Sequence, residues 1–262
     1  MNCKNCNKTL KASQKFCDEC GAKIIQNRLK PQVLAQQVNE QFISIDNKFL
    51  RTFIDLFRQP ETVIVGYING TRKKYIDVLQ YFAIALTLAG IQVFLLTTFF
   101  RDALDFTPEF AKAIENMPEK NINSMAGFNP DFFTKHQGLI YILGVPVSSL
   151  ATWLVYFILG DKRFNFTEHL VINLYYSAQI IIITAVFSIL FLVIGMNYLI
   201  VSTILGLPTF IYLAYVLKKV FKEDFWNTVA KFLIVMVFYM VIYFVLIIIA
   251  AIVLFFNGYF KI

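Results

Sequence analysis

The chain carries five long apolar stretches, and each is close to the roughly 20 residues that a helix needs to cross a bilayer. None of them has a charged residue at its centre, and they cover residues 76–100, 139–160, 169–194, 198–217 and 232–256. Apolar runs of this length without charges are typical of membrane-spanning helices. The pattern therefore predicts an all-α polytopic membrane protein with five transmembrane helices.

A shorter amphipathic pattern precedes the first span. Phe53 and Phe57 share one face of a predicted helix, and Arg58 lies on the other face. This arrangement is typical of a helix in the membrane interface, and packing of the apolar face on the protein itself is the alternative. Gln59-Pro60 should end this helix. We expect a spacer helix before it, with an apolar face made of Leu34, Val38, Phe42 and Ile45.

The composition supports the membrane class, because 58% of the residues are hydrophobic and only 16% are charged. The net charge is +7, and Arg72, Lys73 and Lys74 directly precede the first span. A cytoplasmic N-terminus would place 19 of the 24 Lys and Arg residues on the inner side. The positive-inside rule therefore predicts N-in and C-out, with anionic-lipid recognition as an alternative role for the basic trio. We expect no cleavable signal peptide.

All four cysteines lie near the N-terminus, in two C-x2-C pairs separated by ten residues. They are Cys3, Cys6, Cys17 and Cys20. Two such pairs can complete a closed, tetrahedral, structural Zn²⁺ site, and two disulfides are the alternative. We predict a zinc ribbon in residues 1–23, an amphipathic linker and juxtamembrane region in residues 24–75, and the five-helix transmembrane domain in residues 76–262. Only Phe16 is aromatic in the predicted ribbon, which argues against nucleic-acid binding.

Polar residues recur along one face of the third predicted span. They are His169, Asn173, Tyr176 and Gln179, with Glu168 at the expected cytoplasmic end. A polar stripe in a span must face protein or water. Two interpretations stay open: interhelical hydrogen bonds, or an intramembrane polar site.

The second and fourth spans share a Gly-Pro motif, ILGVP at 142–146 and ILGLP at 204–208. Both spans would run in the same direction, so the motif would lie at matching depths. Interrupted spans in corresponding positions are typical of transporter binding sites, and simple helix packing is the alternative.

Four segments together resemble a known family: FCDECG, FLRTFIDLFRQP, GYINGTRKKY and TEHLVINLYYSAQ. In this order they look like the uncharacterised zinc-ribbon membrane family termed domain of unknown function 3667, over residues 3–179. The chain departs from the family pattern at Pro60-Glu61 and at Asp77. The resemblance implies a multi-pass protein of the bacterial cytoplasmic (inner) membrane. It adds no reaction, because the family's activity is unknown.

The chain contains none of the metalloprotease, serine-hydrolase or phosphate-loop motifs, so we predict a protein that is not an enzyme. The leading hypothesis is a membrane protein, embedded in the lipid bilayer, whose ribbon docks or regulates a cytosolic or membrane protein partner. One alternative is a transporter or pore that uses the polar third span and the two Gly-Pro spans. Another is an accessory membrane effector of a stress or defence system. The sequence leaves the oligomeric state open.

Overall fold

The computed structural model describes residues 2–11, 13–22, 24, 31, 48–104 and 134–256. The chain divides into two compact units, Met1–Asn47 and Lys48–Ile262. The domain boundaries predicted after residues 23 and 75 stay predictions. The predicted spacer helix that carries Leu34, Val38, Phe42 and Ile45 lies outside the described residues.

Five long helices form the core of the second unit: α4 (Val78–Phe99), α8 (Gln137–Ile158), α9 (Phe166–Val193), α10 (Tyr198–Phe221) and α11 (Phe225–Phe256). All five are long and apolar enough to cross a membrane. The described residues contain α-helices, a 3₁₀ turn at Arg101–Leu104 and no named strand. The prediction of an all-helical protein with five candidate spans is confirmed.

The helix ends differ most from prediction around the last two spans. Because α10 continues to Phe221, its last turn contains Lys218 and Lys219. Lysines there interact favourably with the helix dipole, so charge ends the apolar run without ending the helix. The helix α11 begins at Phe225, seven residues before the predicted apolar stretch. The preceding residue is Asp224, whose backbone carbonyl accepts from the N–H of Thr228 (3.1 Å).

Side-chain caps begin three of the spans. Asp77 Oδ1 accepts from Leu79 N at α4, and Asn197 Oδ1 accepts from Leu199 N at α10. The helix α9 begins with a capping box between Asn165 and Glu168. Each cap satisfies a backbone N–H that the helix cannot pair itself, so these short polar side chains set where the helices start.

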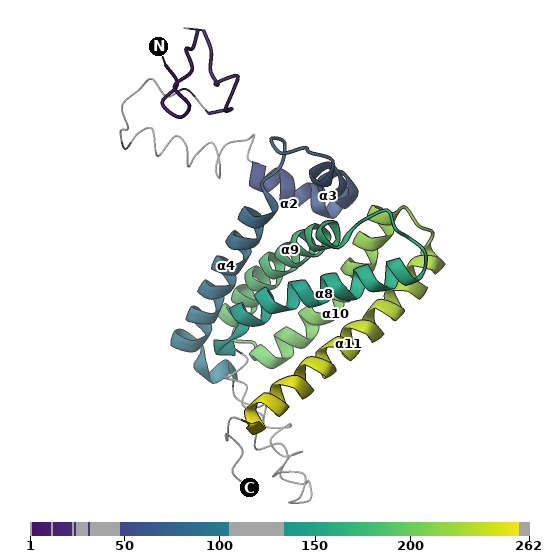
Figure 1. The fold of residues 1–262 in the computed structure, drawn as a ribbon. Coiled ribbons are helices and arrows are strands. Elements are labelled where there is room, and N and C mark those ends of the chain that lie inside the picture. The colour runs from purple at the N-terminus through teal and green to yellow at the C-terminus, as the bar shows by residue number, and fades with distance from the viewer. Residues whose placement is uncertain are drawn as a thin grey trace, which may run out of the picture. The chain divides into compact units, whose positions relative to one another are not determined.

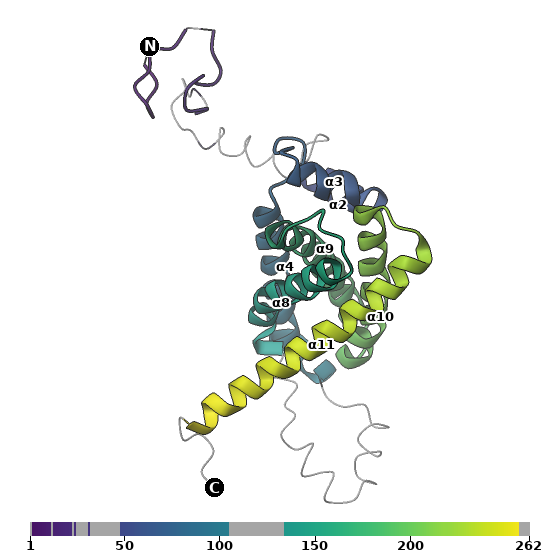
Figure 2. The ribbon, with the colours of Figure 1, turned by 45° about the vertical axis from the view of Figure 1, so that its right-hand side comes forward.

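The helix α9 lies at the centre of the bundle and packs on α4, α8 and α10 (Figures 1 and 2). Its contact with α4 is the most extensive of any helix pair. Ala85 and Ala89 of α4 and Ala178 and Ala185 of α9 are all buried. Small side chains let two membrane helices approach closely, which explains why this pair forms the core. By contrast, α11 packs on α8 and α10 and is the least buried span.

Two short helices, α2 (Lys48–Arg58) and α3 (Pro60–Ile68), lie against one end of the bundle (Figure 1). The predicted end of the first helix at Gln59-Pro60 agrees with the structure, but sequence reasoning missed α3. Proline is well suited to the first position of a helix, where its missing N–H is not needed. The same residue that ends α2 therefore starts α3, and a turn follows at Asn69 and Gly70.

Side chains from the spans satisfy the carbonyl groups left free where α2 ends. Leu56 O lacks its usual helical partner because residue 60 is a proline, and the Tyr212 hydroxyl donates to it (2.9 Å). The Tyr215 hydroxyl donates to Phe57 O (3.0 Å) and lies 3.1 Å from Arg58 O. The break between α2 and α3 is thus tied to α10.

The two interpretations of the α2 amphipathic face each describe one side of this helix. Phe53 packs against the bundle core, and Leu56 is fully buried. Phe49 also packs against the core, whereas Leu50, Ile54 and Phe57 are exposed. The residues predicted to lie at the membrane interface, Arg58 and the Arg72–Lys74 trio, are exposed as well, and their contact with lipid stays a prediction.

The substitution Tyr212→Phe should loosen the α2–α3 pair. It leaves Leu56 O without a donor, at a cost of about 1 to 2 kcal/mol. Hydrogen exchange in micelles should therefore speed up at the α2 and α3 amides and stay unchanged in α9. The control is Tyr239→Phe, which removes a hydroxyl from α11, far from α2 in the chain. Equal exchange in both variants would show that the Tyr212 hydroxyl does not hold α2.

Candidate metal centre and intramembrane polar residues

The four cysteines come together in the first unit. Their Sγ atoms all lie within 4.8 Å of one another. Cys3 and Cys20 have Sγ atoms 3.6 Å apart, and so do Cys6 and Cys17, so each pair joins the two C-x2-C segments. A tetrahedral zinc ion with Zn–S bonds of about 2.3 Å places its sulfurs about 3.8 Å apart. All four are free cysteines, and their arrangement fits a metal ion held by four thiolates.

The two C-x2-C segments share one backbone conformation. Cys3 N donates to Lys8 O (2.8 Å), and Cys17 N donates to Ala22 O (2.9 Å) at the corresponding position. The residue after each second cysteine, Asn7 or Gly21, has a positive φ of 60° or 69°. Asparagine and glycine are the residues that adopt this conformation most readily. Asn7 therefore carries in the sequence the same turn signal as Gly21.

In the described part of this unit, few groups other than a metal could hold the chain together. Its described core contains only Cys3, Leu10 and Cys17 as buried hydrophobic residues. Lys8 bridges to Asp18 (3.3 Å) and Glu19 (3.1 Å), but these groups are exposed and such pairs stabilise little. A hydrogen bond from the Asn5 side chain lowers the pKa of Cys20, whereas hydrogen bonds with the neighbouring thiols raise the pKa of Cys6.

The predicted polar stripe of α9 does not form one site. Glu168 belongs to the capping box: its Oε2 accepts from Asn165 N (2.7 Å). His169 and Asn173 both face Thr152 of α8, with His169 Nδ1 3.1 Å and Asn173 Nδ2 3.0 Å from its hydroxyl oxygen. Thr152 accepts from Asn173 Nδ2 and donates its hydroxyl hydrogen to Ser149 O (3.0 Å), while the direction of its contact with His169 depends on the histidine tautomer.

The other two stripe residues face different helices. The Tyr176 hydroxyl donates to Thr209 O of α10 (3.1 Å). Gln179 is fully buried; it accepts from the Tyr81 hydroxyl of α4 and donates through Nε2 to Phe53 O of α2 (3.1 Å). The stripe therefore joins α9 to four neighbouring helices, which is the role of interhelical hydrogen bonds.

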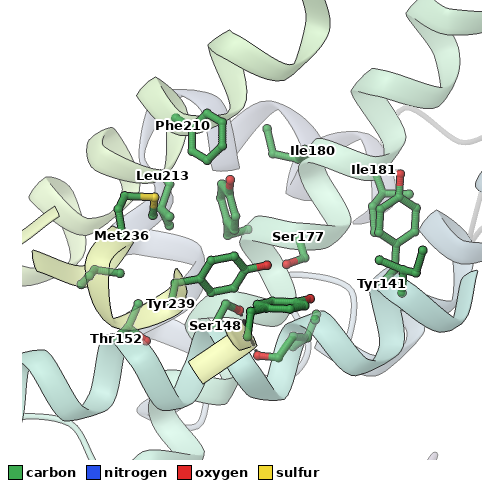
Figure 3. Close-up of a pocket in the computed structure, with 16 residues that line it drawn as sticks. Tyr141, Ser148, Thr152, Ser177, Ile180, Ile181, Phe210, Leu213, Met236 and Tyr239 are labelled. Carbon is green, nitrogen blue, oxygen red and sulfur yellow. Dashed lines mark hydrogen bonds between the residues drawn. The ribbon is translucent and has the colours of Figure 1, made fainter. Parts of the chain in front are cut away.

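Sequence reasoning missed a cavity of about 280 Å³ that lies among α8, α9, α10 and α11. Figure 3 shows the hydroxyl groups of Ser177 and Tyr239 directed into it. None of its lining residues is charged. Gly144 of the ILGVP motif lies in its wall, where an added Cβ would be 3.5 Å from the Tyr243 hydroxyl, whereas Gly206 of ILGLP has open space beside it. The two motifs thus have different surroundings.

Ion pairs join the α8–α9 loop to the α10–α11 hairpin. Arg163 Nη2 lies 2.6 Å from Asp161 Oδ2 and 3.9 Å from Glu223 Oε1, and Lys231 pairs with Glu223. Arg163 holds the pKa of Asp161 below its usual range, so this pair stays charged at neutral pH. These contacts fix the loop ends of two helix pairs to each other.

Hydrogen bonds hold the segment from α2 to the first half of α4 together and join it to α9. Ile76 N donates to the Thr52 hydroxyl (3.1 Å), and the Tyr175 hydroxyl of α9 donates to Ile76 O (2.8 Å). Tyr75 donates to Asp55 (2.9 Å).

Residues 46–90 match the family described as "Protein of unknown function (DUF3667)". The predicted resemblance to this family is confirmed over these residues.

The DUF3667 match thus covers α2, α3, the basic turn and the beginning of α4, and the cysteine unit lies outside it. Within the matched segment, Phe53, Leu56 and Tyr81 form hydrogen bonds with side chains of α9 and α10. No curated protein and no solved structure matches the chain. The DUF3667 segment therefore comprises a helical pair docked on the bundle and the beginning of the first span, and the family description assigns it no activity.

Proposed function

We propose that this chain is a membrane protein without enzymatic activity, whose cytosolic four-cysteine zinc ribbon docks a protein partner. The observation that carries the proposal is the closed set of four cysteine ligands, whose Sγ atoms lie within 4.8 Å of one another. A metal with four protein ligands has no open position for water or substrate, which is the signature of a structural site.

Zinc is the metal that best fits this ligand set. Four thiolates in tetrahedral spacing select Zn²⁺ or an iron–sulfur centre, and paired C-x2-C segments with this spacing are typical of zinc ribbons. A reduced four-cysteine site also requires a reducing compartment. The charge distribution supports the same location, with 19 of 24 Lys and Arg on the N-terminal side of the membrane. We infer a bacterial inner-membrane protein with its N-terminus in the cytoplasm and its C-terminus outside.

A protein partner fits the ribbon better than nucleic acid does. Lys8 is paired with Asp18 and Glu19, and four thiolates around a divalent cation carry a net negative charge. The ribbon thus lacks the strong positive field that nucleic acids require. Small zinc modules of this kind present a rigid surface on few residues, which suits recognition of another protein.

The test is affinity purification of the full-length chain from chemically crosslinked cells. We expect at least one cytosolic or membrane protein to be recovered with the wild type and with Lys15→Ser, which changes an exposed residue that is not a ligand. Cys17→Ser should lose that protein while the membrane content of the chain stays the same. An unchanged set of partners in Cys17→Ser would contradict docking through the ribbon.

The uncharged cavity among α8 to α11 favours a second candidate, passage of a small uncharged solute. Stopped-flow light scattering of proteoliposomes with glycerol and urea would test it. Ser177→Phe should fill the cavity and abolish flux, whereas Val186→Phe, at an exposed position of α9, should not. Proteoliposomes that are no more permeable than empty liposomes would contradict this candidate.

A further inference from the structure

A second cavity, of about 550 Å³, lies where α3, the segment before α4, the α8–α9 loop and the end of α10 meet. At this end of the bundle α4 and α9 begin and α10 ends. The apolar spans give way to polar loops there, so we expect the cavity to lie at the depth of the lipid headgroups. Aromatic residues suited to that depth, Phe225 and Trp226, are exposed at the adjacent start of α11.

Three cationic residues from separate parts of the chain line this cavity: Lys74, Arg163 and Lys222. Asp161 orients the Arg163 guanidinium through contacts of 3.0 Å from Nε and 2.6 Å from Nη2 and offsets part of its charge. Lys74 and Lys222 therefore supply most of the net positive charge. Basic pockets between membrane helices at this level are typical binding places for phosphate-bearing headgroups.

Lys222 adopts an unusual backbone conformation at the edge of the cavity. Its φ is 48°, in the left-handed region, and its N–H donates to Lys218 O and so caps α10. Glycine is the usual residue at such a helix end, because a side chain is disfavoured there. This conformation is compatible with a functional role for the lysine side chain, which lines the cavity.

The cavity also presents one acceptor. Glu61 is the single acidic residue of the lining, and its Oε2 is a buried atom with no hydrogen-bond partner among the described residues. A buried carboxylate oxygen is unfavourable unless a donor reaches it. A ligand for this cavity should therefore carry a donor as well as an anion.

We propose that this cavity binds a phosphate group flanked by a hydrogen-bond donor, the chemistry of phosphoglycerol and phosphoethanolamine headgroups. Lys74, Lys222 and Arg163 bind the phosphate, and Glu61 accepts from the hydroxyl or ammonium group beside it. Phosphocholine, which carries no such donor, binds more weakly. The site depends neither on the cysteine unit nor on its partner.

The test measures binding to the full-length chain in a neutral detergent by native mass spectrometry. The ligands are dihexanoyl phosphatidylglycerol, dihexanoyl phosphatidylcholine and sn-glycerol 3-phosphate. We expect phosphatidylglycerol to bind in preference to phosphatidylcholine. The double variant Lys74→Gln/Lys222→Asn should weaken it about tenfold or more, since two charged contacts to phosphate are lost. Asparagine tolerates the backbone conformation of residue 222. Lys219→Gln, which removes a charge of α10 from outside the lining, should bind as the wild type does.

The Glu61→Met variant separates the two parts of the proposal, because methionine removes the acceptor oxygen that glutamine would keep. It should narrow the preference for phosphatidylglycerol over phosphatidylcholine to the part that net charge alone provides, while phosphate binding persists. Glycerol 3-phosphate binding as tightly as the lipid would support the phosphate site and assign it to a soluble ligand. Equal binding by the double variant and by Lys219→Gln would overturn the proposal, and so would an unchanged lipid preference in Glu61→Met.

Discussion

Replacing Cys17 with serine is expected to reduce the metal content of the purified full-length chain from about one ion per chain to near zero. Cys17 is a buried member of the four-cysteine cluster, and its Sγ lies 3.6 Å from that of Cys6. Structural zinc in small modules contributes roughly 10 to 16 kcal/mol of apparent binding free energy, and that energy is also the energy of folding. With only Cys3, Leu10 and Cys17 buried, the described part of the unit has no other core to retain its shape.

Elemental analysis checks the metal content, and limited proteolysis checks the fold. The Cys17→Ser chain should be cut within about the first 25 residues at protease concentrations that leave the wild type intact there, because loss of the metal unfolds the unit. The matched control Lys15→Ser should keep both the metal and the protection. Retention of a full metal equivalent by Cys17→Ser would show that this residue is not a ligand.

The substitution Gln179→Leu should strongly destabilise the helix bundle. Gln179 is fully buried and joins α9 to both α4 and α2, through the Tyr81 hydroxyl and Phe53 O. Leucine would leave both groups without this partner in an apolar interior, at a cost of about 2 to 4 kcal/mol. The measurement is the free energy of unfolding in mixed micelles titrated with sodium dodecyl sulfate.

Two controls isolate the cause. Thr184→Val, on the same helix, removes a hydroxyl that bonds only to carbonyls of its own helix, and it should cost less than about 0.5 kcal/mol. In a double-mutant cycle, Tyr81→Phe should cost much less in the Gln179→Leu background than alone. Additive costs would mean that the two side chains are not coupled.

The five spans could be predicted because each is a local property of the chain. Length and the absence of charge are enough to identify a spanning helix. The ends were harder, since Lys218 and Lys219 interrupt the apolar run of α10 while favouring its last helical turn. The helix α3 was missed because Pro60 has two roles: it ends α2, as predicted, and it also starts the next helix.

The cysteine ligand set could also be predicted from spacing, because two C-x2-C pairs separated by ten residues are a known metal-ligand pattern. The polar stripe of α9 was not. Periodicity correctly placed Asn173 and Gln179 in a protein interior, but it could not identify the helices that they face. Thr152 and Tyr81, their partners, are 21 and 98 residues away in the chain, and only tertiary packing brings them together. The basic cavity of Lys74, Arg163 and Lys222 was beyond sequence reasoning for the same reason.

The central claim is a closed zinc site on the cytoplasmic side of a membrane protein, and one combined measurement tests it most directly. The purified wild-type chain is analysed for metals, and its cysteines are labelled with a membrane-impermeant maleimide in intact and in permeabilised cells that have been treated with a chelator. We predict about one zinc per chain, with labelling only after permeabilisation. A chain without zinc, or labelling in intact cells, would contradict the metal site or the cytoplasmic N-terminus, respectively.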